Sequence, residues 1–205
     1  MRILIAIPCM DTVRYEFAES LANLCKHLSN IGVDYDLKWH ATSIIYLARE
    51  ELVNFAINDG GYDSVLWLDS DMVFLPSAFD LLRSLDTDFA TGCYRTRRPP
   101  YCFVMERVDD PALRVDKLPN EPFEVAACGF GMVLIKTKAL YQVRANFGTC
   151  FTPTPSTGED YAFCNRFRQT GGRIIAHPDA IADHVTYIKL RCDDPKFLVN
   201  YQEMR

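Results

Sequence analysis

The sequence predicts an α/β fold in which helices flank a mostly parallel central sheet, with a small second, antiparallel sheet. The 205 residues, of which 49% are hydrophobic, are enough for one domain with a sizeable core. Between residues 2 and 68, apolar runs alternate with segments of helical spacing, which is the order of α/β proteins. The run Val65–Leu68 lacks polar alternation, as expected of a parallel strand covered on both faces.

The first elements follow in a regular order. A β-branched run that ends at Pro8 predicts the first central strand. Apolar residues at mostly i+3 and i+4 spacing then predict a helix that begins after Asp11 and Thr12 and ends at Gly32. The remaining elements of this half are an alternating strand at 33–39, a helix at 44–57 and a strand at 64–68.

Shorter elements and polar loops make up the rest of the chain. Ser77 is the expected N-cap of a helix at 78–85. Residues 94–101 are a loop rich in Arg and Pro, and residues 107–122 are a surface loop or lid. Strands are expected at 89–93, 102–106, 123–128, 132–135 and 173–176, helices at 138–147 and 159–169, and a loop at 149–158.

Composition excludes several classes of protein. A formal net charge of -5 argues against a mainly electrostatic nucleic-acid binder, although Arg95, Arg97 and Arg98 form a local basic patch. The eight cysteines show neither CxxC nor zinc-finger spacing, so we expect reduced thiols in a cytoplasmic protein. The N-terminal apolar run is too short for a signal peptide, and no run approaches the roughly 20 residues of a membrane span. We therefore expect no stable membrane insertion.

Two acids follow the Val65–Leu68 strand directly, in the segment Asp69-Ser70-Asp71. The carboxyl ends of the strands are where open α/β sheets bind ligands. Oxygen ligands of this kind suit Mg²⁺ or Mn²⁺ carrying a diphosphate. The alternative is that either aspartate caps the next helix, but Ser77 is better placed for that.

Two further segments contain groups able to do chemistry. Glu159 and Asp160 open a helix, where acids also occur simply because they meet the positive end of the helix dipole. His184 lies in an apolar segment, and a lone histidine is more often structural than a ligand. Gly129-Phe130-Gly131 separates two expected strands, where glycine indicates a bulge or a close backbone approach.

Taken in order, these segments resemble the GT-A fold of nucleotide-sugar glycosyltransferases, most closely the small family-2-like enzymes of phages, large viruses and bacteria. The resemblance covers residues 2–186 and also includes Ser43–Arg49 and Gly92-Cys93-Tyr94, whereas Glu50 stands where many members have Asn. It implies one GT-A domain over 1–205. A nucleotide-binding half at about 1–93 would precede an acceptor and catalytic half at about 94–186 and a tail at 187–205.

The resemblance also implies roles for individual residues. Asp71 would bind Mn²⁺ or Mg²⁺, His184 would be a further ligand, and Asp69 would touch the ribose, a metal-bound water or the metal. Asp160 would be the catalytic base, with Glu159 orienting it or the sugar. The residues that would line the nucleotide pocket are Pro8, Cys9, Met10, Arg49 and Ser70, and those that would let the backbone approach the donor sugar or acceptor are Gly129, Phe130 and Gly131.

The expected function is metal-dependent transfer of a sugar from a nucleotide-diphosphate donor, with a UDP-sugar favoured, to an acceptor hydroxyl. Direct displacement would invert the anomeric centre, although a retaining reaction is possible on the same scaffold. One alternative is a sugar nucleotidyltransferase, but Pro8–Thr12 lacks the glycine-rich phosphate loop of that class. Another is a non-catalytic sugar-nucleotide or carbohydrate-binding module. A glycan, a glycoprotein or a modified nucleobase could be the acceptor, and the tail could close over the donor.

Overall fold

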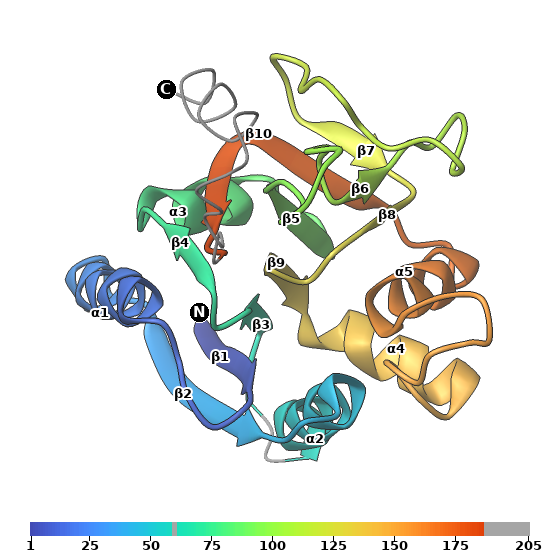
Figure 1. Cartoon of the computed structure of the whole chain (residues 1–205). Helices are drawn as coiled ribbons and strands as arrows, with labels where there is room; N and C mark the ends of the chain where they lie inside the picture. The colour runs from blue at the N-terminus through green and yellow to red at the C-terminus, as the bar shows by residue number, and fades with distance from the viewer. Residues whose placement is uncertain (59–60, 187–205) are drawn as a thin grey trace.

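The computed structural model describes residues 1–58 and 61–186, and the tail predicted as a lid lies outside them. An eight-stranded sheet has the order β2-β1-β3-β9-β5-β10-β4, with β7 also paired to β10, and helices cover both of its faces (Figure 1). The main-sheet strands are β1 (Arg2–Cys9), β2 (Asp34–Ala41), β3 (Ser64–Leu68), β4 (Met72–Phe74), β5 (Phe89–Cys93), β7 (Phe123–Val125), β9 (Met132–Lys136) and β10 (Ile174–His184).

The other elements match most of the expected ones. The second sheet is the antiparallel pair β6 (Met105–Glu106) and β8 (Ala127–Cys128), which confirms the predicted small sheet. The helices are α1 (Tyr15–Asn30), α2 (Ile45–Asn58), α3 (Ser77–Ser84), α4 (Thr137–Phe147) and α5 (Glu159–Gln169). Gly32 follows α1 with a positive φ of 68°, as the predicted stop requires.

Strand direction confirms a mostly parallel sheet. β1 pairs in parallel with β2 and with β3, and β5 pairs in parallel with β10. β9 is inserted antiparallel between β3 and β5, so those two strands share one direction. β4 and β7 are antiparallel to β10. The carboxyl ends of β1, β3 and β5 therefore lie at one edge of the sheet.

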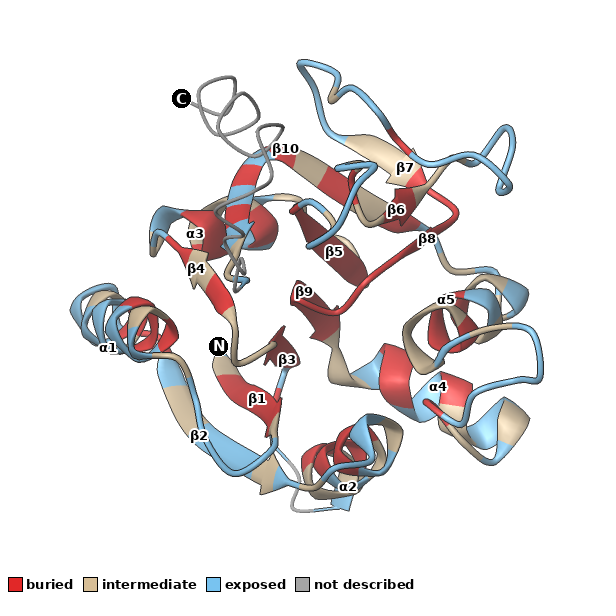
Figure 2. Ribbon diagram, viewed as in Figure 1, coloured by how far each residue is buried: buried red, intermediate tan, exposed pale blue. Residues whose placement is uncertain are grey.

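Strand alternation divides the core into two layers, one on each face of the sheet (Figure 2). Val65 and Trp67 of β3 face one layer, where they join Leu52 of α2 and residues of α4 and α5. Leu66 and Leu68 face the other layer, which α1 and α3 complete. Burial on both faces explains why β3 has no polar residue between Val65 and its final leucine.

The end of β10 differs from the prediction. The sequence predicts a strand at 173–176, followed by His177 and Pro178. The strand instead continues to His184 through a register shift between Ala176 and Ile181. Beyond the shift Ile181 still pairs with Cys93 of β5, and the last three residues of β10 pair with β4, where His184 lies opposite Met72. An irregularity in one strand thus brings His184 next to the acids that follow β3.

Ser77 is not the N-cap of α3, contrary to expectation. Pro76 already has helical φ and ψ, and Ser77 is the first residue of the helix, with no capping hydrogen bond from a side chain. Asp69 and Asp71 do not cap the helix either, because β4 intervenes. The expected strand at 123–128 is divided between the two sheets as β7 and β8, and that at 102–106 is reduced to β6.

Other expectations concern the chain as a whole. Within residues 1–58 and 61–186, no helix combines the length and apolarity that a membrane span requires. The cysteines in these ranges are free thiols, and Cys93, Cys128, Cys150 and Cys164 are buried. The segment 107–122 contains no helix or strand, as predicted for a loop.

Candidate functional site

A cleft of about 620 Å³ opens at the carboxyl edge of the sheet. The ends of β1 and β3, the start of α2, the loop after β5, the start of α5 and the end of β10 all contribute to it. The predicted residues that line it are Pro8, Cys9, Met10, Arg49, Asp69, Ser70, Asp71, Glu159, Asp160 and His184. Side chains far apart in the sequence therefore meet in one place.

Arg49 lies at the centre of this cleft, and its side chain is only 2% exposed. Nη2 of Arg49 is 3.0 Å from Oδ1 of Asp69 and 3.3 Å from Oδ1 of Asp160, and Nε is 3.9 Å from Glu159. Burial acts to lower the pKa of Arg49, but these carboxylates raise it above its ordinary value. Arg49 is therefore a fixed positive charge that holds the two acidic segments together.

An aromatic cage surrounds the same guanidinium. Its carbon lies 5.1 Å from the ring centroid of Phe130, 5.8 Å from that of Phe151 and 6.0 Å from that of Trp67. Rings at these distances attract a cation while excluding water from it. Although Arg49 belongs to the lining of the cleft, its guanidinium is almost fully buried and its contacts are with these rings and with the carboxylates.

Asp71 faces two different partners. Its Oδ2 lies 3.6 Å from Nε2 of His184 and 3.0 Å from Nη2 of Arg97. Burial acts to raise the pKa of Asp71, but His184 and Arg97 lower it below its ordinary value. For Asp69 burial prevails and raises the pKa, with Arg49 opposing and Asp71 adding to the rise. The two aspartates of the motif therefore differ electrostatically.

The second nitrogen of His184 has its own partner. Nδ1 lies 3.1 Å from the backbone oxygen of Arg95, and since a carbonyl oxygen only accepts, Nδ1 is the donor. That hydrogen bond directs Nε2 toward Asp71. Histidines that bind metals usually donate from the other ring nitrogen to a carbonyl or carboxylate in this way.

Asp71 and His184 are the candidate ligands of the cleft for a divalent metal. Across the described part of the chain, no three His, Cys, Asp or Glu side chains are grouped closely enough to hold a metal ion. Asp71 and His184 do face each other with a carboxylate oxygen and an imidazole nitrogen, which fits one edge of an Mn²⁺ site. Oδ1 of Asp69 is directed at Arg49 instead.

Asp160 and Glu159 occupy the first turn of α5, as predicted. The backbone N–H of Phe130 donates to Oδ2 of Asp160 at 3.3 Å, which fixes the carboxylate. Burial raises the pKa of Asp160 to about 7, with Asp69 and Glu159 adding to the rise and Arg49 opposing it. A carboxyl group that titrates near neutrality, while remaining 27% exposed, suits a general base.

Gly129 and Gly131 make room for the side chain of Tyr94. A Cβ on Gly129 would lie 2.1 Å from the Tyr94 hydroxyl, and one on Gly131 would lie 2.7 Å from the Tyr94 ring. The N–H of Gly131 donates to that hydroxyl at 3.0 Å. Phe130 is fully buried. Tyr94 therefore fills the space on the Cβ side of both glycines, and the approach of the donor sugar or acceptor to this backbone stays a prediction.

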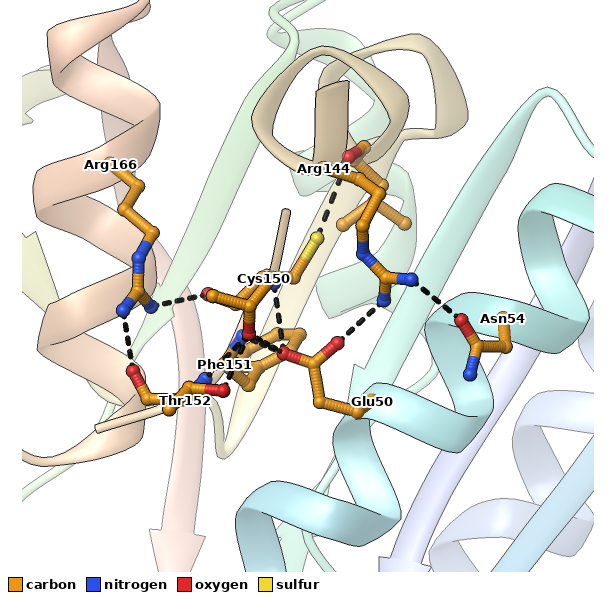
Figure 3. Close-up of polar contacts among 9 residues, drawn as sticks. Glu50, Asn54, Arg144, Cys150, Phe151, Thr152 and Arg166 are labelled. Atoms are coloured by element: carbon orange, nitrogen blue, oxygen red, sulfur yellow. Dashed lines mark hydrogen bonds and ion pairs between the residues drawn. The ribbon is translucent and has the colours of Figure 1, made fainter. Parts of the chain in front are cut away.

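Glu50, which departs from the family pattern, fixes the chain that leads to α5 (Figure 3). Its Oε1 accepts hydrogen bonds from the backbone N–H groups of Cys150 and Phe151, and its Oε2 pairs with Arg144. Arg166 of α5 donates to the carbonyl of Cys150 at 2.9 Å. Glu50 therefore connects α2 to the start of α5, next to Arg49.

Several residues of the cleft were not predicted as site residues. Tyr94 and Arg97 come from the loop after β5, and the others are Thr42, Ser43, Ile45, Thr96 and Val104. The sequence predicts a basic patch in this loop but assigns no cleft role to Arg97. A second cavity of about 620 Å³ lies near the start of β3, away from Asp69 and Asp71. One of its lining lysines, Lys136, is paired with Asp86 and Asp88.

Comparison with solved structures identifies the fold. A structure of GalNAc-T7 with UDP, GalNAc and Mn²⁺ has a TM-score of 0.61 and 11% identity, covering 95% of this chain and 45% of that chain. The chain has a GT-A-like fold. A197 from STIV also has a TM-score of 0.61, with 22% identity, covering 93% of this chain and 100% of that chain. No family model and no curated protein sequence matches the chain.

Proposed function

We propose that this protein is a metal-dependent glycosyltransferase that transfers a sugar from a nucleotide diphosphate, with UDP favoured, to an acceptor hydroxyl. The observation that carries the proposal is the convergence of Asp71, His184 and Asp160 on one cleft of a GT-A-like fold. A fold alone does not specify a function, so the argument depends on the chemistry of these groups.

The donor would lie between the end of β1 and the start of α2, where Pro8, Cys9 and Met10 line the cleft. Asp71 and His184 would hold the metal, with Asp69 as ligand or ribose contact, and the nitrogen ligand favours Mn²⁺ over Mg²⁺. When bound, the metal stabilises the charge on the departing diphosphate. Arg97, which neutralises Asp71 in the structure, would be free to contact the phosphates once a cation takes its place.

Asp160 would remove the proton of the acceptor hydroxyl. A hydroxyl is a poor nucleophile until a positioned base accepts its proton, and such a base typically contributes ~10²–10⁴-fold. The Phe130 N–H and Arg49 orient Asp160 from behind, which leaves its exposed edge for the acceptor. Glu159 would orient Asp160 or the sugar. With Asp160 acting as the base, the reaction would be an inverting direct displacement.

The acceptor is the remaining part of the same proposal. A glycan, a glycoprotein or a modified nucleobase would reach the cleft past the loop that carries Arg95, Arg97 and Tyr101. Arg95 is already engaged, since it lies over the ring of Phe103 at 4.2 Å. This leaves Arg98 as the arginine of the loop best able to meet an acidic acceptor.

Calorimetry with UDP and with GDP, each with and without Mn²⁺, tests the donor site. We expect one nucleotide to bind only with the metal, and Asp71→Ala to abolish that binding. Asp116→Ala, an exposed aspartate on the 107–122 loop, is the matched control and should bind like wild type. Absence of nucleotide binding under every metal condition would overturn the proposal and favour a carbohydrate-binding module.

A further inference from the structure

β2 is an outer strand of the main sheet, and its exposed edge carries both apolar and charged residues. Among the described residues it pairs only with β1, along its whole length from Asp34 to Ala41. Leu37 and Trp39 are each 40% exposed, and Figure 2 shows β2 as exposed or intermediate throughout. An outer strand presents a row of backbone N–H and C=O groups that is a template for pairing with another chain, unless the strand is covered or its charges repel the partner.

The backbone of β2 is poised for such pairing. The N–H of Asp34 donates to Met1 and the N–H of Thr42 donates to Cys9, so even-numbered residues of this segment turn their backbone groups toward β1. Because backbone direction alternates along a strand, the N–H and C=O groups of Tyr35, Leu37 and Trp39 point away from the sheet. These groups form the unpaired rim that an added strand would need.

The side chains of β2 are complementary to themselves. When two copies run antiparallel with Leu37 opposite Leu37, Tyr35 faces Trp39 of the other copy. On the opposite face of the strand, Asp36 faces Lys38 and Asp34 faces His40. Each cross-pair occurs twice because of the two-fold axis. Aromatic pairs and opposite charges directly across a ladder are both stabilising.

The neighbouring registers lack this complementarity. Sliding the strands to place the axis on Asp36 sets two carboxylates opposite each other, and an axis on Lys38 sets two amines opposite each other. Like charges directly across a ladder are destabilising. Only the register centred on Leu37 combines outward-pointing backbone groups on the axis with attractive charge pairs on both sides of it.

Local contacts hold the charged groups on one face. Asp36 accepts hydrogen bonds from Arg2 at 2.7 Å and from Tyr62 at 2.8 Å, yet its side chain remains 47% exposed. The amine of Lys38 lies over the ring of Phe55 at 4.3 Å, on the α2 side of the sheet. Both groups are thus pre-positioned along the open edge, between α1 and α2 (Figure 1).

We propose that a second copy of this chain docks on β2, antiparallel and centred on Leu37, so that the two main sheets become continuous. The cleft lies at the carboxyl edge of each sheet and stays open in such a dimer, because β2 contributes no residue to its lining. The inference is independent of the proposed glycosyl transfer.

The first test is sedimentation of the full chain over a concentration series. Wild type should behave as a dimer. Lys38→Asp places an aspartate opposite Asp36 of the other copy, once on each side of the two-fold axis. This variant should weaken the dimer by roughly tenfold or more. Lys117→Asp makes the same charge change in the exposed 107–122 loop and should leave the dimer intact. A monomeric wild type at every concentration, or an undiminished Lys38→Asp dimer, would overturn the proposal.

A charge-swap pair provides a second readout. Asp36→Lys alone should also weaken the dimer, because two amines would face each other on each side of the axis. Mixing Asp36→Lys with Lys38→Asp restores opposite charges in the Asp36–Lys38 cross-pairs and should give a heterodimer that is tighter than the homodimer of either variant. Circular dichroism of each variant first verifies folding. Failure of two folded variants to associate would show that the register centred on Leu37 does not form.

Discussion

Arg49 and Asp160 join the two halves of the candidate site, with Nη2 of the arginine 3.3 Å from Oδ1 of the aspartate. Arg49 comes from α2 and also neutralises Asp69 after β3, whereas Asp160 opens α5. Asp69, next to the proposed metal site, and Asp160, the proposed base, therefore share Arg49 as their buried counter-ion. A change to either helix should alter both sides of the site.

Replacing Arg49 with methionine should destabilise the fold. Three carboxylates would lose their buried counter-charge, and breaking a buried ion pair on one side typically costs about 3–5 kcal/mol. Urea unfolding measures the loss. Arg83→Met, on the exposed surface of α3, is the control. Adding Asp160→Asn to Arg49→Met should recover part of the loss, and a double variant no more stable than Arg49→Met would contradict this account.

Activity should increase with pH through a midpoint near 7 if Asp160 is the base. Its pKa is raised to about 7, and only the ionised form accepts a proton. Asp160→Asn should reduce turnover by ~10²–10⁴-fold and remove this acid limb. A pH profile of kcat/KM for donor hydrolysis provides the measurement. A wild-type profile without an acid limb would exclude Asp160 as the titrating base.

The same shift predicts an opposite effect on stability. A carboxyl group whose pKa is higher in the folded state binds its proton more tightly there, so the folded state loses stability as pH rises from about 4 to about 7. Asp160→Asn should therefore unfold at a higher urea concentration than wild type at pH values above this window, and with little difference below it. Equal midpoints at both ends would contradict the raised pKa.

Gly129→Ala should destabilise the protein by about 1–3 kcal/mol, as overpacking typically does. The new methyl group would meet the Tyr94 hydroxyl, which is held in place by the Gly131 N–H. Tyr94→Phe removes that hydroxyl and should relieve part of the loss. Gly158→Ala is the control, because nothing lies within 4 Å of its Cβ position and its φ is -61°. Thermal unfolding of Gly129→Ala, Tyr94→Phe, their double variant and Gly158→Ala gives the comparison.

Glu50→Ala should loosen the approach to α5. It would leave the Cys150 and Phe151 N–H groups and Arg144 without their shared acceptor, and we expect a loss of about 3–5 kcal/mol. Hydrogen exchange should increase at residues 150 and 151. The neighbouring Glu51 is exposed on the same helix, so Glu51→Ala should leave both stability and exchange unchanged.

Local signals in the sequence predicted much of this fold. The apolar run Val65–Leu68 and the start of α5 at Glu159 were both placed correctly, because burial on two faces and acids in a first helical turn leave clear patterns. The gathering of Asp71, Asp160 and His184 in one cleft was anticipated only through the resemblance to a family. Periodicity does not report contacts between distant segments.

The features that were not predicted from the sequence depend on tertiary contacts. The continuation of β10 past Pro178 depends on its pairing with β5 and with β4, which no local pattern specifies. The glycines around Phe130 accommodate Tyr94, a residue distant in the sequence. Arg97 belongs to a loop that is polar in composition, and its pairing with Asp71 emerges only once β10 and the loop after β5 are adjacent.

Release of free nucleotide from a panel of UDP-sugars and GDP-sugars, with and without Mn²⁺, tests the central claim most directly. Water can replace the unidentified acceptor in this assay. We predict metal-dependent release from one donor by wild type, loss of release in Asp71→Ala and Asp160→Asn, and full release in Asp116→Ala. Absence of release from every donor, or release that persists in both site variants, would contradict assignment of glycosyl transfer to this cleft.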